Sequence, residues 1–156
     1  MATVTFYLLE TNDEDSRQKF ACKLAADYCY RQSRAHILVP NQQYLKELDE
    51  MLWEHPSDRF VPHVVLAGGS ESCLVTLNAE AQFDGTGDVL INTTSNVPDM
   101  ASQFHRTCEI VLATERPRAR EHYRQYRSLD YELFYEVHDE DADSLNSPSP
   151  PAPEEK

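Results

Sequence analysis

Two short apolar runs alternate with two longer stretches of helical spacing over residues 1–54, and this alternation restricts the fold more than any other feature. Residues 3–9, TVTFYLL, are β-branched and aromatic, as is typical of a strand. Residues 35–39, AHILV, form a continuous apolar run of the kind found in strands buried on both faces. Residues 15–33 and 42–54 repeat apolar side chains with a helical period. This order predicts an α/β domain with a parallel strand pair and a right-handed crossover.

The rest of the chain continues this pattern with shorter elements. We predict strands at residues 64–67, 73–78, 88–92 and 108–113, turns at 68–70 and 84–87, and a helical segment at 98–105. Residues 129–137 add an edge strand or a packed extension. A chain of 156 residues suits a single core. We therefore expect one domain over residues 1–137, built on a mixed, mostly parallel sheet flanked by helices.

The composition changes at residue 138. Residues 138–156, HDEDADSLNSPSPPAPEEK, contain six acidic residues, one lysine and scarcely any large apolar side chain. A segment of this composition cannot bury enough apolar surface to offset the entropy of ordering, so we predict a disordered acidic tail. The charged residues of this segment sum to −5. This charge suggests the hypothesis that the tail folds back on the basic run at residues 114–127 and competes there weakly with a partner.

Residues 114–127, TERPRAREHYRQYR, hold the one dense run of positive charge in the sequence. Read as a helix, the run places four arginines and one aromatic residue on a single face: Arg116, Arg120, Tyr123, Arg124 and Arg127. The neighbouring face has the spacing of a buried stripe and carries Ala119, His122, Tyr126 and Leu129. The pattern predicts a small anion-binding surface with an aromatic edge.

The charge of the whole chain helps to interpret this basic helix. An arginine-rich helix face is most often only a solvated surface. The formal net charge is −13, however, which disfavours a general attraction to polyanions and argues against direct binding of single-stranded nucleic acid. A concentrated basic strip on such an acidic chain favours a short acidic partner instead.

The sequence lacks the usual motifs of nucleotide binding and catalysis. A glycine-rich phosphate loop would follow the first strand, but residues 10–16 read ETNDEDS there and the chain has four glycines. No G-x-S-x-G or H-E-x-x-H motif occurs. The four cysteines are scattered without a C-x-x-C pair, which favours buried thiols over a zinc site. We expect no cofactor and no catalysis, and a small α/β enzyme or nucleotide-binding protein remains the alternative.

The sequence also carries no membrane or export signal. No run of eighteen apolar residues is present. Residues 1–10, MATVTFYLLE, lack the basic start and the cleavage site of a signal peptide. We therefore expect no membrane partner and a cytoplasmic location.

Five short motifs follow one another along the chain. They are ATVTFYLL at residues 2–9, LDEMLW at 48–53, FVPH at 60–63, DVLIN at 88–92 and REHYRQYR at 120–127. In this order and spacing the chain resembles the chi subunit of the bacterial DNA polymerase III holoenzyme, a component of the clamp-loader assembly. The resemblance covers roughly residues 2–135. It implies a Rossmann-like α/β domain that has no catalytic activity of its own.

The resemblance also implies partners and site residues. Chi-like proteins pair with the psi subunit, which tethers them to the clamp loader, and they bind the acidic C-terminal tail of single-stranded DNA-binding protein, which ends in a phenylalanine carboxylate. Carried onto matching positions, the tail-binding residues are Val111, Arg120, Tyr123 and Arg124. The sequence is shorter than the family pattern between Val111 and Ala119, and Arg116 is a further basic candidate.

By the same resemblance, Trp53 and Phe60 belong to the surface that chi-like proteins use for psi and, alternatively, for a helicase. Two large aromatic side chains around a proline-broken loop also have the composition of an interface hot spot. The plainer interpretation places both residues in the core. We expect them at the partner surface.

Overall fold

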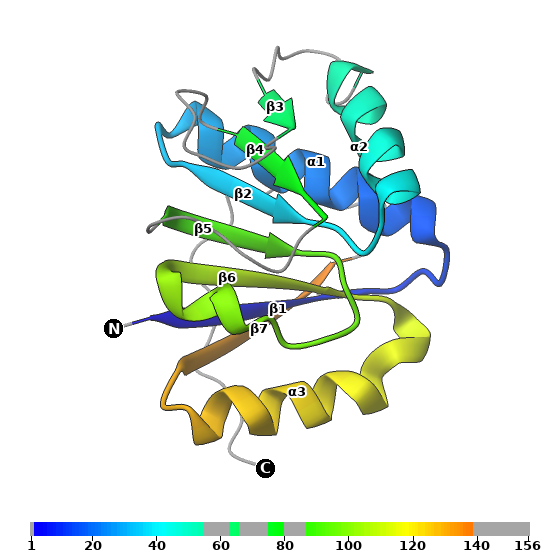
Figure 1. The fold of residues 1–156 in the computed structure, drawn as a ribbon. Coiled ribbons are helices and arrows are strands. Elements are labelled where there is room, and N and C mark those ends of the chain that lie inside the picture. The colour runs from blue at the N-terminus through cyan, green and yellow to red at the C-terminus, as the bar shows by residue number, and fades with distance from the viewer. Residues whose placement is uncertain (1, 55–62, 66–74, 80–86, 139–156) are drawn as a thin grey trace.

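The computed structural model describes residues 2–54, 63–65, 75–79 and 87–138, and these form a seven-stranded sheet with helices on both faces (Figure 1). The strands are β1 (Thr3–Leu9), β2 (Ala35–Leu38), β3 (His63–Val65), β4 (Val75–Asn78), β5 (Gly87–Asn92), β6 (Phe104–Val111) and β7 (Glu132–His138). The helices are α1 (Glu14–Tyr30), α2 (Gln42–Glu54) and α3 (Arg116–Ser128), with short 3₁₀ turns η1 (Asp99–Gln103) and η2 (Ala113–Glu115). Phe60, Cys73, the expected turn at 68–70 and residues 139–156 lie outside the described residues.

The strand order is β3-β4-β2-β5-β6-β1-β7, and every pairing between the described strands is parallel. The α/β prediction is confirmed, and the sheet is parallel throughout these strands where the sequence suggested a mixed one. α1 carries the chain past β6 and β5 to β2, whereas α3 carries it past β1 to β7. Because right-handed crossovers toward opposite edges place their helices on opposite faces, α1 and α3 lie on opposite sides of the sheet.

The predicted elements differ from the observed ones mainly between residues 98 and 138. α2 spans the predicted 42–54, and the edge strand expected within 129–137 is β7, which extends to His138. The helical segment expected at 98–105 is wrong as an α-helix. Only the 3₁₀ turn η1 forms there, and Phe104, 4% exposed, already begins β6. A helix this short is costly to nucleate, so burial of Phe104 against the sheet decides the conformation.

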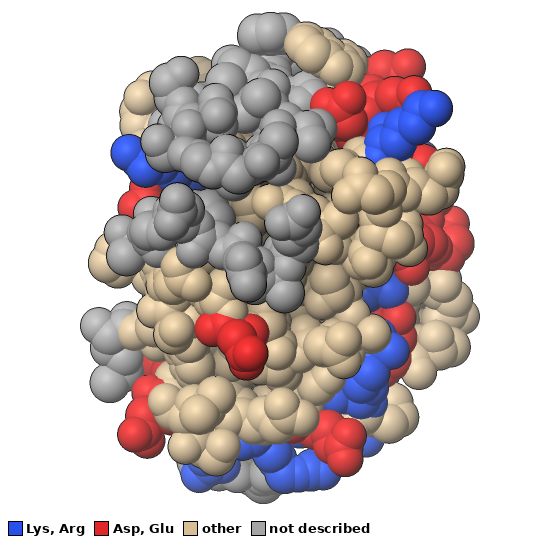
Figure 2. All heavy atoms as spheres, in the orientation of Figure 1, with Lys and Arg blue, Asp and Glu red and all other residues tan. Residues whose placement is uncertain are grey.

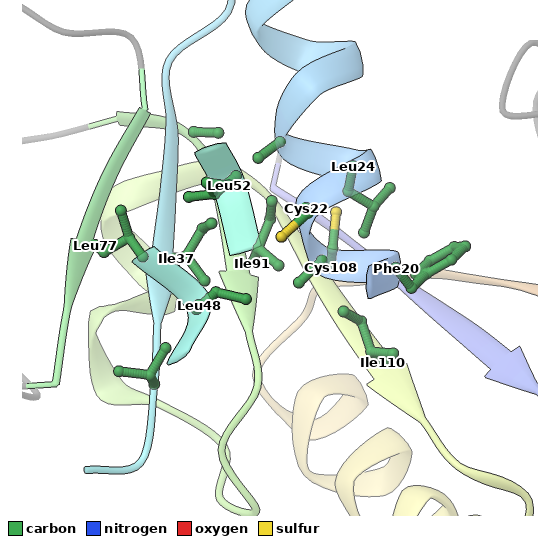
Figure 3. Close-up of a cluster of buried hydrophobic side chains, with 14 of the residues drawn as sticks. Phe20, Cys22, Leu24, Ile37, Leu48, Leu52, Leu77, Ile91, Cys108 and Ile110 are labelled. Carbon is green, nitrogen blue, oxygen red and sulfur yellow. The ribbon is translucent and has the colours of Figure 1, made fainter. Parts of the chain in front are cut away.

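Side chains of β1 alternate between two cores, one on each face of the sheet. Tyr7 and Leu9 belong to the core beneath α1 and α2. Val4 and Phe6 belong to the core beneath α3. The first core contains the predicted stripes of both helices, among them Phe20, Leu24, Leu48 and Leu52 (Figure 3). A site beside α3 therefore has the second core as its base.

Candidate functional site

α3 follows the carboxyl end of β6 and carries the predicted basic face. Pro117 stands in its first turn, where a missing backbone N–H breaks no helical hydrogen bond. Lys and Arg side chains gather along the lower edge of the molecule, where α3 lies (Figures 1 and 2). Four of the five residues of the predicted face line one groove: Arg116, Arg120, Tyr123 and Arg124. Arg127, the fifth, is exposed and does not line it.

The floor of this groove, which we call the α3 groove, is apolar and comes mainly from two strands. Phe6 and Leu8 of β1 and Tyr135 of β7 line it, and its volume is about 400 Å³. The ring centroids of Phe6 and Tyr123 lie 5.9 Å apart, within the usual range of an aromatic pair. The α3 groove thus combines a cationic rim with an aromatic floor, which suits a ligand that carries both negative charge and an apolar side chain.

Among the described residues, no carboxylate forms an ion pair with the arginines of the α3 groove. Within the described part of the chain, neither Arg116 nor Arg120 nor Arg124 forms an ion pair. Arg116 Nη2 donates to the backbone oxygen of Leu9 at 3.4 Å, and its buried Nε makes no hydrogen bond to a described residue. Because a guanidinium has five N–H donors, Arg116 retains donors for a ligand.

An ion network around the buried Arg17 fixes the position at which α3 begins. Arg17 of α1 is 6% exposed and donates to Glu115 Oε2 at 2.7 Å and to Glu14 Oε2 at 2.7 Å. Its Nη1 also donates to the backbone oxygen of Ile110 at 2.9 Å, and Tyr44 of α2 donates to Glu14 at 2.6 Å. Burial opposes the charge, but the two carboxylates raise the pKa of Arg17 above its usual value. The network thus joins α1, α2 and β6 to the residue that precedes α3.

A second buried contact holds α3 against the sheet further along. Tyr126 is completely buried, as its place in the predicted stripe indicated, and its hydroxyl donates to Glu109 Oε2 at 2.5 Å. Asn92 Nδ2 donates to the same oxygen at 2.9 Å. Burial raises the pKa of Glu109 to about 7, although both hydrogen bonds oppose the shift. With both contacts in place, the groove-facing side chains project from a preorganised helix.

Several positions of the sequence prediction lie elsewhere than expected, and of the predicted stripe only Tyr126 is fully buried, whereas Ala119 and His122 are partly exposed. Val111 does not line the α3 groove: it is buried in the second core, and Leu8, its cross-strand partner, lines the groove instead. Leu129, expected in the buried stripe with Tyr126, is 62% exposed. The reason is that α3 ends at Ser128, so the helical spacing no longer places Leu129 on the buried face.

Sequence reasoning missed the strand residues of the groove. Alternation along β1 does put Phe6 and Leu8 on one face, and this signal was available in the sequence. Which helix covers that face depends on the strand order, however, and Tyr135 joins the floor only because β7 pairs with β1. Local patterns therefore predict the rim of the α3 groove but not its floor.

Trp53 lies in the last turn of α2 and is 59% exposed. The core interpretation of this residue is therefore wrong. An exposed tryptophan at a helix end is a suitable anchor for a protein partner, because its ring offers a large apolar surface. The carboxyl end of α2 lies at the top of Figure 1 and α3 at the bottom, so Trp53 and the α3 groove are separate surfaces.

The described residues show no group of three His, Cys, Asp or Glu side chains placed to hold a metal ion. Cys22 and Cys108 are buried free thiols, as predicted, and burial raises the pKa of each to about 12. Such thiols are chemically inert near neutral pH, since the thiolate is the reactive form. Across the same residues, every helix is too short or too polar to cross a bilayer.

Fold and groove together define a parallel α/β domain with a cationic, apolar groove beside its last helix. Residues 1–134 match the model of the family described as DNA polymerase III chi subunit, HolC. This chain therefore belongs to the DNA polymerase III chi subunit family, as the motifs in its sequence predicted.

Individual relatives agree with this assignment. The chain is 29% identical over 135 residues to DNA polymerase III subunit chi of Pseudomonas aeruginosa, a match that covers 85% of this chain and 94% of that protein. It is 27% identical over 141 residues to subunit chi of Escherichia coli, covering 85% and 96%. The crystal structure of T4 UvsW is similar with a TM-score of 0.64 over 88% of this chain and 42% of that one. At 7% identity, the last likeness concerns the fold alone.

Proposed function

We propose that this protein is a replication adaptor without catalytic activity of its own. It binds the acidic C-terminal tail of single-stranded DNA-binding protein in the α3 groove, and it binds the psi subunit at the surface around Trp53. Membership of the chi family supports a role in the DNA polymerase III assembly. The observation that carries the tail-binding part is the α3 groove, where three arginines without an ion pair to any described residue surround an aromatic floor.

The groove divides the recognition of such a tail between charge and apolar contact. Arg120 lies in the middle of the groove-facing side of α3, and its guanidinium binds the terminal carboxylate through two parallel donors. The terminal phenylalanine ring packs against Phe6 and Tyr123. Arg116 and Arg124 lie one helical turn to either side and attract the acidic residues that precede the terminus, where salt screens the gain.

Replacement of Arg120 tests the tail-binding proposal. We expect Arg120→Ala to weaken binding of a labelled tail peptide by about 2 kcal/mol, roughly thirtyfold, because a charged hydrogen bond at a hot spot is lost. Fluorescence anisotropy measures the change. Arg34→Ala removes the same charge from an exposed residue outside the groove and is the matched control. Equal affinities of wild type and Arg120→Ala would refute the assignment.

Replacement of Trp53 tests the second surface. We expect Trp53→Ala to leave the affinity for the tail peptide unchanged and to weaken binding of purified psi by about 2 kcal/mol, the usual size of a hot-spot loss. Isothermal titration calorimetry measures both affinities. Binding of a helicase that is lost with Trp53→Ala while psi binding persists would assign the surface to the alternative partner. Failure of both variants in both assays would indicate misfolding, which circular dichroism detects.

A further inference from the structure

The end of β7 lies beside the cationic rim of the α3 groove. The last pair of the β1–β7 ladder is Leu9 with His138, and the backbone oxygen of Leu9 accepts the hydrogen bond from Arg116 Nη2 at 3.4 Å. Neighbouring strands in a sheet are about 4.8 Å apart. The chain therefore leaves the sheet only one strand away from the carbonyl group that Arg116 contacts.

Buried contacts hold this end of β7 in place. His138 is 6% exposed, and its ring centroid lies 5.7 Å from that of Tyr7 and 5.1 Å from that of Phe20. Its Nε2 also lies 2.8 Å from Glu136 Oε1. Because His138 packs into the core beneath α1, the attachment point of residue 139 is fixed relative to Arg116.

The residues that follow His138 have the charge that the rim lacks. Residues 139–143 read DEDAD and bring four carboxylates directly after the strand. The family match ends at residue 134, so this acidic segment lies beyond what defines the family. The rim of the α3 groove contains three arginines that form no ion pair within the described residues.

We propose that the acidic segment 139–143 binds the arginine rim of the α3 groove and competes there with acidic peptide ligands. The competition with a peptide rests on the proposed function of the groove. The contact between segment 139–143 and the rim does not depend on it. Tethering raises the effective concentration of the segment at the rim to the millimolar range, so even weak ion pairs are populated. The segment has no aromatic residue, so it occupies the rim and leaves the aromatic floor for a ligand.

Two charge-matched variants of the full chain test the proposal. The near variant combines Asp139→Asn with Glu140→Gln, and the far variant combines Glu154→Gln with Glu155→Gln. Both remove two negative charges, but only the near pair directly follows His138 in the sequence. We expect the near variant to bind a labelled acidic peptide with a C-terminal phenylalanine about two- to fivefold more tightly at low salt, the size of one or two exposed ion pairs. The gain should vanish near ~0.5 M salt because screening removes it.

The far variant separates docking from general repulsion. We expect it to bind this peptide with wild-type affinity. An equal gain in both variants would overturn the proposal, because repulsion by net charge would then explain the effect without a contact at the rim. Wild-type affinity in both variants, with peptide binding intact, would overturn it as well and would leave the proposed function standing.

A second measurement needs no peptide. The side-chain Nε–H resonances of Arg120 and Arg124, recorded by NMR in the free protein, should shift in the near variant and stay unchanged in the far variant. A shift without peptide binding by any variant would support the contact while refuting the proposed function. Identical arginine resonances in wild type and near variant would overturn the contact.

Discussion

Arginine has two different roles on the two sides of the start of α3. Arg17, on the α1 side, is 6% exposed and bonds to two carboxylates and one backbone oxygen. Arg120 and Arg124, on the groove side, are exposed and form no ion pair with a described residue. The comparison teaches that pairing and burial, rather than residue type, separate a structural arginine from a candidate ligand-binding one.

The cost of removing charge from water explains the difference. A buried guanidinium is tolerated only when carboxylates and hydrogen bonds compensate its lost hydration, so folding fixes Arg17 between Glu14 and Glu115. An exposed guanidinium keeps its hydration and remains available. In a chain of net charge −13, three arginines without an ion pair to a described residue concentrate positive charge on one rim, as the proposed binding of an acidic tail requires.

The largest expected effect is the loss of protein stability when Arg17 is replaced. We expect Arg17→Ala to lower the free energy of unfolding by about 3–5 kcal/mol, because the network loses its buried cation and Glu115 retains only the more exposed Arg118 among its described basic partners. Arg120→Ala should change it by less than about 0.5 kcal/mol, as for most surface substitutions. Urea denaturation followed by circular dichroism measures both values. Similar losses of unfolding free energy in Arg17→Ala and Arg120→Ala would contradict the distinction between a structural and a ligand-binding arginine.

Stability should depend on pH in opposite directions at two acids, the buried Glu109 and the partly exposed Glu115. Burial raises the pKa of Glu109 to about 7, so its contribution to stability is complete below its usual pKa of 4.5 and is lost as the pH rises toward 7. Burial opposes the charge of Glu115 too, but Arg17 and the Leu112 N–H lower its pKa. The contribution of Glu115 to stability is therefore present when the pH is above the usual pKa of a glutamate, and it is lost as the pH falls through the lowered pKa.

Glu109→Gln isolates the first of these effects. Between pH 4.5 and 7, we expect wild type to lose about 3 kcal/mol of unfolding free energy relative to Glu109→Gln, because the shift of the Glu109 pKa corresponds to that energy. Denaturation at a series of pH values measures the difference. Parallel pH profiles of the two proteins would show that Glu109 keeps an ordinary pKa and that burial does not dominate at this site.

The smallest expected effect concerns Arg118, which is intermediate between the two sets. Its Nη2 pairs with Glu115 at 3.1 Å, but its side chain is 41% exposed. We expect Arg118→Ala to change the unfolding free energy by less than about 0.5 kcal/mol and the affinity for the tail peptide by less than about twofold, as is usual for exposed ion pairs. Denaturation and anisotropy measure the two quantities. A large loss of peptide affinity would extend the ligand site beyond the α3 groove.

Much of the fold could be predicted from local pattern. The strand–helix order of residues 3–54 follows from short apolar runs and from helical spacing, and the basic face within residues 114–127 follows from a period of about 3.6 residues. Predictions from local pattern were wrong at the ends of helices and strands. Leu129 lies past the end of α3, and Phe104 belongs to a strand where helical composition suggested otherwise.

The sequence by itself determined that this chain is an α/β protein of the chi family and that its last helix presents arginines on one side. Only the tertiary structure decided what those arginines surround. The floor joins residues 6 and 8 to residue 135, and strand pairing brings such distant segments together. Pairing likewise buried Val111 and assigned Arg17 to a network with Glu115. The physical reason is that periodicity reports which face of an element is apolar, whereas contacts depend on the order in which the strands assemble.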